Sequence, residues 1–456
     1  MSQGPRAERL VIEFATGISW DALPTGVRAA AGRCLVDLVG VAAGGFGLPQ
    51  ATIVREHVLA RGGEDSAAVW FTGRGAPAAD AAWANATAIE SLDAHDGHAL
   101  TKGHAGVALL PGLLALYARK PDAPGTELLG SLVAGYELAT RLGMALHATA
   151  ADYHSSGAWN AVAVAIAGAA ALGGRGETLL HAAGIAEYFA PRGPMMRCIA
   201  RPTMVKDSSG WGCRVGVEAA ELALAGFTGA PAELVSGLLR RTGPHQGVGI
   251  SQLWADLGTR WRIEEQYVKP YPVCRWAQPA VEAVLLLRRQ HRIEPAAIAS
   301  ITVGSFAEAV SLAITQPADT EQAQYSLPFA VAAALQAGTL GVAEVSGPAL
   351  TDPAIQKLAS KVVLREVPAH SAGFPAVRRA DAAIVLHDGT RLDVRDVGAR
   401  GDPDVPLSQD EIDAKFSSLS QPLLGAAGTA RLRQALARFL GKPARVSEFA
   451  EVLGRP

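Results

Sequence analysis

Apolar residues recur at every third or fourth position through about the first 265 residues, and Gly or Pro separates the segments. This spacing places the apolar side chains on one face of a helix. No alternating pattern of the kind that strands show interrupts it, so the sequence predicts a large all-helical domain. The strongest helical segments are residues 27–41, 78–92, 106–119, 126–147, 157–172 and 212–227.

Beyond Trp261 the pattern changes to short runs rich in Val, Ile and Leu. Such runs are typical of strands, and the turn His387-Asp388-Gly389 between two of them predicts a hairpin. Because helical patterns alternate with these strands, we predict a smaller α+β domain from residue 268 to 403. The predicted strands are residues 299–304, 361–367, 382–386 and 391–394, and the predicted helices are 278–289, 327–336 and, in a tail after the acidic stretch 408–413, 430–440.

The composition indicates a large buried fraction. Only 18% of the 456 residues are charged, whereas 49% are hydrophobic. A formal net charge of -2 gives no general reason to bind nucleic acid or an anionic membrane, so a small neutral or anionic ligand is favoured. The longest apolar run, residues 161–174, is shorter than a membrane span and predicts a buried core helix.

The four cysteines are far apart in the sequence and form no CxxC pair, which argues against an iron–sulfur cluster or a zinc ribbon. The first residues lack a basic region followed by an apolar stretch, so they do not resemble a secretory signal. Both observations fit reduced thiols, and we expect a cytoplasmic protein.

Residues 93–104 concentrate titratable side chains in an otherwise charge-poor chain. Histidine ionises near neutral pH, and neighbouring carboxylates and lysines shift its pKa or share protons with it. This segment is therefore the first candidate for catalysis. Its titratable residues are Asp93, His95, Asp96, His98, Lys102 and His104.

Lysine is scarce, because only eight of the 41 basic residues are Lys. Lys206 and Lys269 are the only two between residues 121 and 356. A chain that uses Arg for most of its positive charge retains Lys where a compact ammonium is needed, although chance alone also accounts for such a distribution. His154 directly precedes an apolar helix and is a candidate to project into a cleft, or else a simple cap or surface residue.

Imidazole and carboxylate groups also suit zinc, iron or manganese. A rival interpretation therefore treats part of the 93–104 segment as a metal site. Its spacing matches no established ligand motif. The four ligands of this rival site would be His95, Asp96, His98 and His104.

Four blocks of sequence follow one another in a characteristic order. They are an acidic segment with His104 and an apolar helix (residues 91–111), Tyr153-His154 before a small-residue helix, Met204-Val205-Lys206 with Gly226-Phe227-Thr228-Gly229 at the end of the next helix, and Lys269-Pro270-Tyr271-Pro272-Val273-Cys274. Each block is weak alone, but their order and spacing are specific. By them the chain resembles, over nearly its whole length, the MmgE/PrpD family, whose members include 2-methylcitrate dehydratase, cis-aconitate decarboxylase and iminodisuccinate epimerase.

The resemblance implies a mainly α fold, in which a helical domain of residues 1–267 and 404–456 carries an α+β lid of residues 268–403. It also implies a homodimer that needs no metal or organic cofactor, and a di- or tricarboxylate substrate. The chemistry implied is removal of a proton alpha to a carboxylate, which requires a base and stabilisation of the developing negative charge. On this basis we predict catalytic roles for His104, His154, Asp93 and Lys206, and substrate binding by Lys269, His95, Asp96, His98, Lys102 and Cys274.

Three departures from the family pattern bear on the reaction. His95 stands where family dehydratases and decarboxylases commonly have a carboxylate, and the decarboxylase has histidine and tyrosine where this chain has Cys274 and Phe329. Decarboxylation of cis-aconitate is therefore disfavoured. We predict a dehydratase-like lyase; an epimerase of a similar polycarboxylate is the alternative, and a carboxylate-binding protein without catalysis is a third reading.

Overall fold

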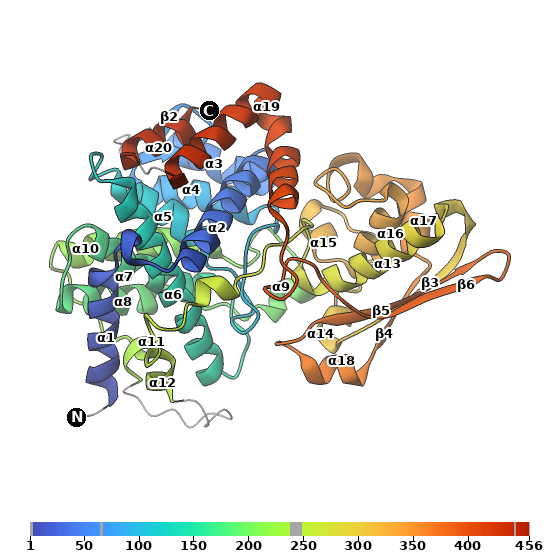
Figure 1. Ribbon diagram of the computed structural model, residues 1–456, viewed down its shortest axis with the longest axis horizontal. Helices are drawn as coiled ribbons and strands as arrows, with labels where there is room; N and C mark the ends of the chain where they lie inside the picture. Colours follow the sequence, from blue (N-terminus) through green and yellow to red (C-terminus); the bar gives the residue numbers. More distant parts are fainter. Residues whose placement is uncertain (1–2, 64–66, 238–248, 442–443, 456) are drawn as a thin grey trace.

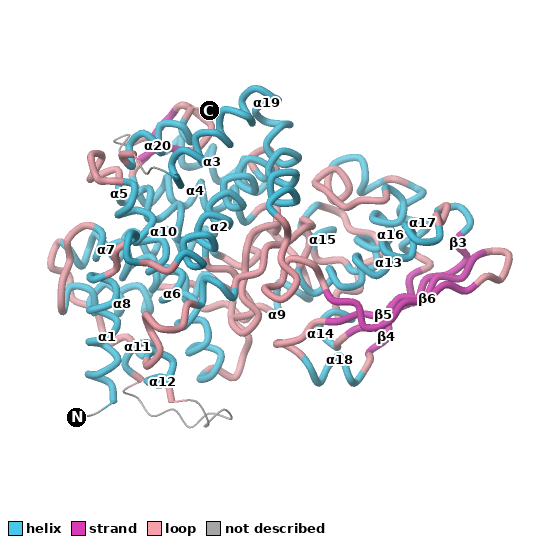
Figure 2. The backbone as a smooth tube through the Cα atoms, viewed as in Figure 1, coloured by secondary structure: helices cyan, strands magenta, loops and turns pink. Residues whose placement is uncertain are grey.

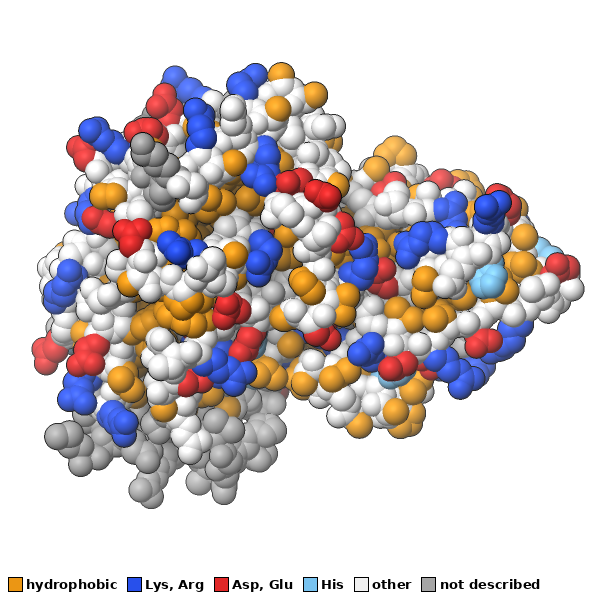
Figure 3. Space-filling model, in the orientation of Figure 1, with side chains coloured by type: hydrophobic (Ala, Val, Ile, Leu, Met, Phe, Trp, Pro, Cys, Tyr) orange, Lys and Arg blue, Asp and Glu red, His pale blue; other side chains and the backbone are white. Residues whose placement is uncertain are grey.

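The computed structural model describes residues 3–63, 67–237, 249–441 and 444–455, which form two lobes side by side (Figure 1). The larger lobe consists mostly of helices, whereas the smaller one contains a sheet covered by helices on one face. The mainly α fold with an additional α+β part is therefore confirmed. Figure 3 shows that acidic and basic side chains alternate over the visible face of both lobes, in agreement with the near-zero net charge.

All six helices predicted for the first half are present, and each end lies within a few residues of its expected position. The prediction for the last of them, residues 212–227, is displaced by three residues toward the C-terminus, because the helix spans Ser209–Leu224. The helices of this part are α1 Gln3–Gly17, α2 Thr25–Gly45, α3 Pro49–Arg61, α4 Ala78–Glu90, α5 Gly106–Tyr117, α6 Gly125–Thr149, α7 Gly157–Ala171, α8 Glu177–Phe189, α9 Met196–Ala200, α10 Ser209–Leu224, α11 Glu233–Ser236 and α12 Ile250–Trp254.

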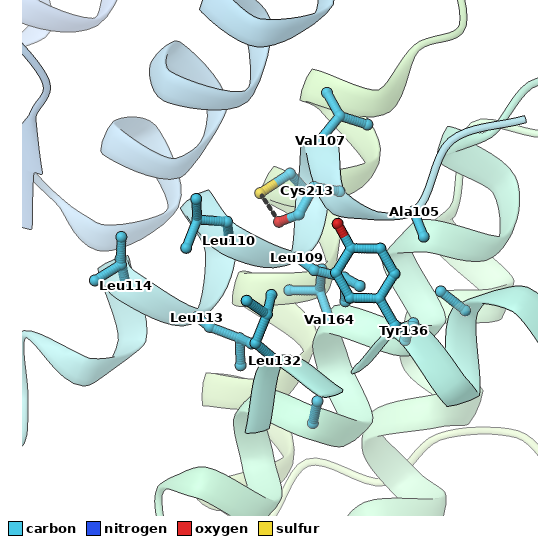
Figure 4. Packing of buried hydrophobic residues seen from close by; sticks show 14 of the residues in the cluster. Ala105, Val107, Leu109, Leu110, Leu113, Leu114, Leu132, Tyr136, Val164 and Cys213 are labelled. Atoms are coloured by element: carbon cyan, nitrogen blue, oxygen red, sulfur yellow. Dashed lines mark hydrogen bonds between the residues drawn. The ribbon is translucent and has the colours of Figure 1, made fainter. Parts of the chain in front are cut away.

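The core of the larger lobe packs α5 and α7 against α6 and α10. Figure 4 shows Leu109 and Leu113 of α5 near Leu132 of α6. In the same view the Cys213 thiol donates a hydrogen bond to the Ala108 carbonyl oxygen at 3.1 Å. Such close packing excludes water and fixes the relative positions of the four helices.

Two glycines allow α7 and α10 to approach at their first turns. A Cβ atom placed on Gly212 would lie 2.6 Å from the Cα atom of Gly157, which no real side chain tolerates. The Gly157 N–H also donates to the Asp207 carbonyl oxygen at 3.0 Å. This crossing places the segment before α10 directly against the segment before α7.

The prediction that the first half contains only helices is wrong in one detail. Strand β1 Ala67–Val69 pairs with strand β2 Arg74–Ala76 in an antiparallel hairpin. Three residues are too few to produce a recognisable alternation of apolar and polar positions, which explains why the pattern gave no sign of them.

The smaller lobe is built on a four-stranded sheet in the order β4-β3-β5-β6. Strands β3 and β4 are parallel, and the other two pairs are antiparallel. Helices α13 and α16 lie over one face of the sheet (Figure 2), and all four predicted strands are confirmed. The elements are α13 Gln278–His291, β3 Ile298–Ser305, α14 Ala307–Val310, α15 Thr320–Gln324, α16 Leu327–Ala337, α17 Pro353–Ala359, β4 Val362–Glu366, α18 Pro368–Gly373, β5 Arg379–Leu386 and β6 Arg391–Gly398.

The tail returns to the larger lobe and is more helical than predicted. Helix α19 spans Gln409–Gly441 with a break at Gly425, where φ is 66°, and α20 Val446–Gly454 follows. The acidic stretch 408–413, which we expected to lead into the helix, supplies its first turn. Asp410 and Glu411 there face the positive end of the helix dipole, a favourable arrangement.

Among the described residues, no single helix is both long and apolar enough to cross a membrane. The bent pair α2 and α3 together reaches the length and apolar composition of a membrane span, by these two criteria only.

Phe416 of α19 joins the tail to the core. Its side chain is buried, and a Cβ atom on Gly40 of α2 would lie 2.9 Å from its ring. We expect Phe416→Ala to lower the free energy of unfolding by about 3 kcal/mol, because the ring leaves a cavity. Urea denaturation followed by circular dichroism measures this change. Phe227→Ala is the control: Phe227 is 51% exposed, so its loss should cost less than about 0.5 kcal/mol. Equal effects of the two substitutions would contradict the role of Phe416 in joining the tail to the core.

Candidate active site

A narrow cavity lies where the 93–104 segment of the larger lobe meets the smaller lobe. Loops rather than regular elements occupy the region between the lobes, as Figure 2 shows. Both lobes contribute charged groups to the wall of the cavity. Its principal polar residues are Asp93, Lys102, His104, Asp207, Lys269 and Arg378.

Backbone hydrogen bonds hold the 93–104 segment in place. Gly97 and Tyr267 exchange two of them, at 2.8 and 3.1 Å, and the His98 N–H donates to the Gly103 carbonyl oxygen at 2.9 Å. A side chain at position 97 would collide with the Tyr267 hydroxyl group, since a Cβ atom would lie 2.5 Å away. Glycine is therefore required where the segment passes Tyr267.

The ring of His104 is fixed in one tautomer. Its Nδ1 lies 2.6 Å from the backbone carbonyl oxygen of Asp96, which only accepts hydrogen bonds, so Nδ1 carries the proton. The lone pair of Nε2 therefore points away from this bond, toward Asp93 and the cavity. Burial, and next the charge of Lys269, lower the pKa of His104 to about 3, so the imidazole is neutral and able to accept a proton.

Asp93 and Lys269 form a buried ion pair beside this base. The Lys269 ammonium lies 2.6 Å from Asp93 Oδ1 and 2.8 Å from the Asp93 carbonyl oxygen. The same Oδ1 is 4.0 Å from His104 Nε2. A proton taken up by His104 would thus come to lie next to a carboxylate that stabilises the imidazolium.

Asp207 supports the backbone of His104 through Ser156, and sequence reasoning missed it. Its carboxylate accepts hydrogen bonds from the Ser156 N–H at 3.0 Å and from the Ser156 hydroxyl group. The Ser156 Oγ in turn accepts a hydrogen bond from the backbone N–H of His104 at 3.0 Å. Burial raises the pKa of Asp207 to about 6. The one available signal was its position directly after the rare Lys206.

Two cations of the cavity wall have no carboxylate within 4.0 Å among the described residues. Lys102 lies with its ammonium 4.9 Å from the centre of the Tyr153 ring, and Arg378 with its guanidinium 4.9 Å from the centre of the Tyr267 ring. Sequence reasoning did not single out Arg378, because Arg is common in this chain. The cavity therefore offers unpaired positive charge to an anionic ligand.

Lys206 lies beside the cavity but not in its wall. Its ammonium donates to the carbonyl oxygens of Glu90 and Ser91, at 3.2 and 2.5 Å, and to Gln324 Oε1 at 2.5 Å. These three bonds use all its protons and connect the two lobes. Burial lowers its pKa to about 8. In this geometry Lys206 fixes the wall rather than reaching a ligand.

His154, the second histidine predicted to be catalytic, lies outside the cavity wall. Its Nδ1 is 2.8 Å from the Asp152 carbonyl oxygen, and its N–H donates to His147 at 3.2 Å. The preceding residue, Tyr153, lines the cavity instead.

The remaining predicted binding residues separate into two groups. Cys274 lines the cavity, and burial raises the pKa of its thiol to about 12. His98 turns away and lies 3.0 Å from Glu265, whereas the carboxyl group of Asp96 is buried close to Tyr136. His95 lies behind His104, with 4.4 Å between ring centres, and neither of its ring nitrogens has a hydrogen-bond partner among the described residues.

The structure does not bring together the four ligands of the rival metal site, because His98 and Asp96 face other neighbours. A different set, Asp93, His95 and His104, has its ligating atoms within 4.8 Å of one another. The carboxylate of that set already carries the Lys269 ammonium, whose fixed positive charge opposes a divalent cation. These residues therefore fit a metal ion poorly.

A lysine from the tail holds the start of the 93–104 segment. The Lys415 ammonium of α19 lies 2.5 Å from Asp37 Oδ1 and 2.7 Å from the Ala94 carbonyl oxygen. The sequence gave no indication that residue 415 would approach residue 94.

Comparison with protein families gives two matches in chain order. The MmgE/PrpD N-terminal domain matches residues 10–239, and the MmgE/PrpD C-terminal domain matches residues 271–439. A comparison with curated proteins gave no match.

The tautomer and charge of His104 can be observed directly. In a long-range ¹H–¹⁵N correlation spectrum of histidine-labelled protein, we expect a neutral ring protonated on Nδ1 from pH 5 to 9, because its pKa is about 3. His104→Gln assigns the signals. Protonation of Nε2, or a titration near the ordinary histidine pKa, would contradict this geometry.

Asp96 should make stability depend on pH. Burial, and next the charge of Asp37, raise its pKa from 3.8 to about 7, so the folded protein keeps a proton that the unfolded chain releases. Between about pH 4 and 7 this residue therefore loses about 1.4 kcal/mol of stability for each unit of rising pH. Urea denaturation across this range should show that the stability of Asp96→Asn rises relative to that of the wild type by about 1.4 kcal/mol for each unit of rising pH. Asp122→Asn, at a highly exposed position, should run parallel to the wild type. Parallel curves for Asp96→Asn would show that Asp96 is ionised in the folded protein.

Proposed function

The chain belongs to the MmgE/PrpD family, and from this premise we propose that it is a dehydratase-like lyase that removes a proton alpha to a carboxylate of a small di- or tricarboxylic acid. Membership supports an enzyme of dehydratase or lyase type in general. The observation that carries the finer proposal is the neutral His104, whose Nε2 lone pair faces a cavity lined by unpaired cations.

His104 acts as the base. Its Nδ1–H bond to the Asp96 carbonyl oxygen keeps the Nε2 lone pair in place, and Asp93 stabilises the imidazolium after proton transfer. A low pKa makes the free histidine a weak base. The negative charges of a bound polycarboxylate would raise that pKa and increase its basicity in the complex.

The cations stabilise the charge that develops on the substrate. Loss of the proton places negative charge on the oxygens of the adjacent carboxylate, and Lys269 and Lys102 both line the space in which those oxygens would lie. A hydroxyl group on the neighbouring carbon then leaves as water once it receives a proton. Lys102 is partly buried with a lowered pKa, which suits it to donate that proton.

Epimerisation is the second candidate, and Cys274 is the observation that favours it. The thiol lines the cavity and stays protonated because burial raises its pKa to about 12. A substrate without a leaving group would form the same carbanion at His104, and a proton donor on another wall would return a proton to the opposite face.

Solvent deuterium exchange followed by NMR tests the proposal. We expect the wild type to exchange the alpha protons of at least one acid among citrate, 2-methylcitrate, the aconitate isomers and iminodisuccinate. His104→Gln should lower that exchange by about 100-fold or more, because the base is lost. His98→Gln is the matched control, since His98 is buried in the same segment but faces Glu265.

A substitution of His154 tests the position of this residue against the catalytic role that the sequence predicted for it. With its ring outside the cavity wall, His154→Gln should keep the exchange. Unchanged exchange in His104→Gln would refute the role of that residue as base. Ligand-induced thermal stabilisation without exchange in the wild type would instead indicate a carboxylate-binding protein.

A further inference from the structure

Arg378 occupies the boundary between the inner cavity and an outer groove. It lies on the smaller lobe, directly before β5, and is only 7% exposed. The groove continues outward and is lined by residues 98–100, Glu265 and Tyr267 on one side and by residues 376–379, 398–399 and 402–405 on the other. Arg378 lines both spaces, as do Ala99 and Tyr267. An anion that enters through this groove must therefore pass the guanidinium.

A comparison with Arg275 shows how unusual the charge of Arg378 is. Both guanidinium groups lie over the ring of Tyr267, at 4.7 Å for Arg275 and 4.9 Å for Arg378. Arg275 is neutralised by Asp402 at 2.7 Å and also donates to Gln278 Oε1 at 2.9 Å. Among the described residues, Arg378 has no carboxylate within 4.0 Å. Burial of an arginine without such a partner is costly, so the position favours a ligand that supplies one.

The chemistry of the missing partner follows from the side chain. A guanidinium presents parallel N–H groups that match the two oxygens of a carboxylate, which a lysine ammonium does not. Tyr267 also contacts the base, because its ring centre is 6.2 Å from that of His104. A molecule held at both points would contact the larger lobe through His104 and the smaller lobe through Arg378.

We propose that Arg378 binds the substrate carboxylate remote from the reacting carbon, and thereby selects acids with at least two carboxylates. This inference rests on the proposed function, since it places the reacting carbon at His104. A monocarboxylate bound there leaves the buried guanidinium without a carboxylate, and a buried charge that lacks a counter-ion is a strong basis for rejection. Arg378 is thus a specificity-determining residue on the smaller lobe.

Calorimetric binding of two probes tests this role without requiring turnover. Tricarballylate carries three carboxylates and no leaving group, whereas butyrate carries one carboxylate. The wild type should bind tricarballylate at least about 100-fold more tightly than butyrate. In Arg378→Gln that preference should fall by about 50-fold or more, through weaker tricarballylate binding with butyrate unchanged. Arg378→Lys keeps the charge without the paired N–H groups and should lose about tenfold.

Arg395→Gln is the matched control, because Arg395 is an exposed arginine of β6 in the same lobe. It should bind both probes within twofold of the wild type. Thermal unfolding establishes that each variant is folded, and Arg378→Lys carries the test if Arg378→Gln does not fold.

Three results would overturn the inference: a wild type that does not prefer tricarballylate, Arg378 variants that keep the preference, or variants that lose affinity for both probes equally. The last result would show a general effect of charge rather than recognition of the remote carboxylate. Failure of the proposed function looks different. In that case tricarballylate binding depends on Arg378 while the wild type exchanges no alpha proton.

Discussion

The buried pair of Lys269 and Asp93 is the constraint on which the site depends. An ammonium removed completely from water is tolerated only beside an anion, and Asp93 supplies both a carboxylate and a carbonyl oxygen. The pair thereby fixes the start of the 93–104 segment against the connection to the smaller lobe. Burial is the main reason that the His104 ring is neutral, and the charge of Lys269 lowers its pKa further while Asp93 opposes this effect. One interaction thus fixes the surroundings of the candidate base and the junction of the lobes.

His95 adds no charge to the surroundings of this pair. Burial, and next the proximity of His104 and the charge of Lys269, lowers the pKa of His95 well below its usual value. The uncharged ring behind His104 therefore offsets none of the positive charge of the nearby lysines, which are Lys206, Lys269 and Lys415.

The sequence predicted the fold well because periodicity reports burial directly. Helices such as α5 and α7 are apolar almost throughout, and the strands of the smaller lobe are bounded by clear turns. The site was predicted less completely, because residue type does not reveal direction. The rarity of Lys206 indicated importance, yet its ammonium is used to join the lobes. His154 and Tyr153 are neighbours in the sequence, and only the tyrosine lines the cavity. The sequence did not indicate a role for Arg378, because arginine is common in this chain. Its lack of a carboxylate partner is a property of the folded chain.

The contact between Lys415 and Ala94 has a consequence for how the protein is made. The two residues are separated by 321 positions in the chain, so a ribosome completes the 93–104 segment long before it adds the lysine that holds the segment from below. Until the tail emerges and docks, the carbonyl oxygen of Ala94 and the carboxylate of Asp37 must be satisfied by water. The larger lobe therefore begins to form before Lys415 is present, and α19, which follows much later in the chain, supplies the ammonium that holds the 93–104 segment in place.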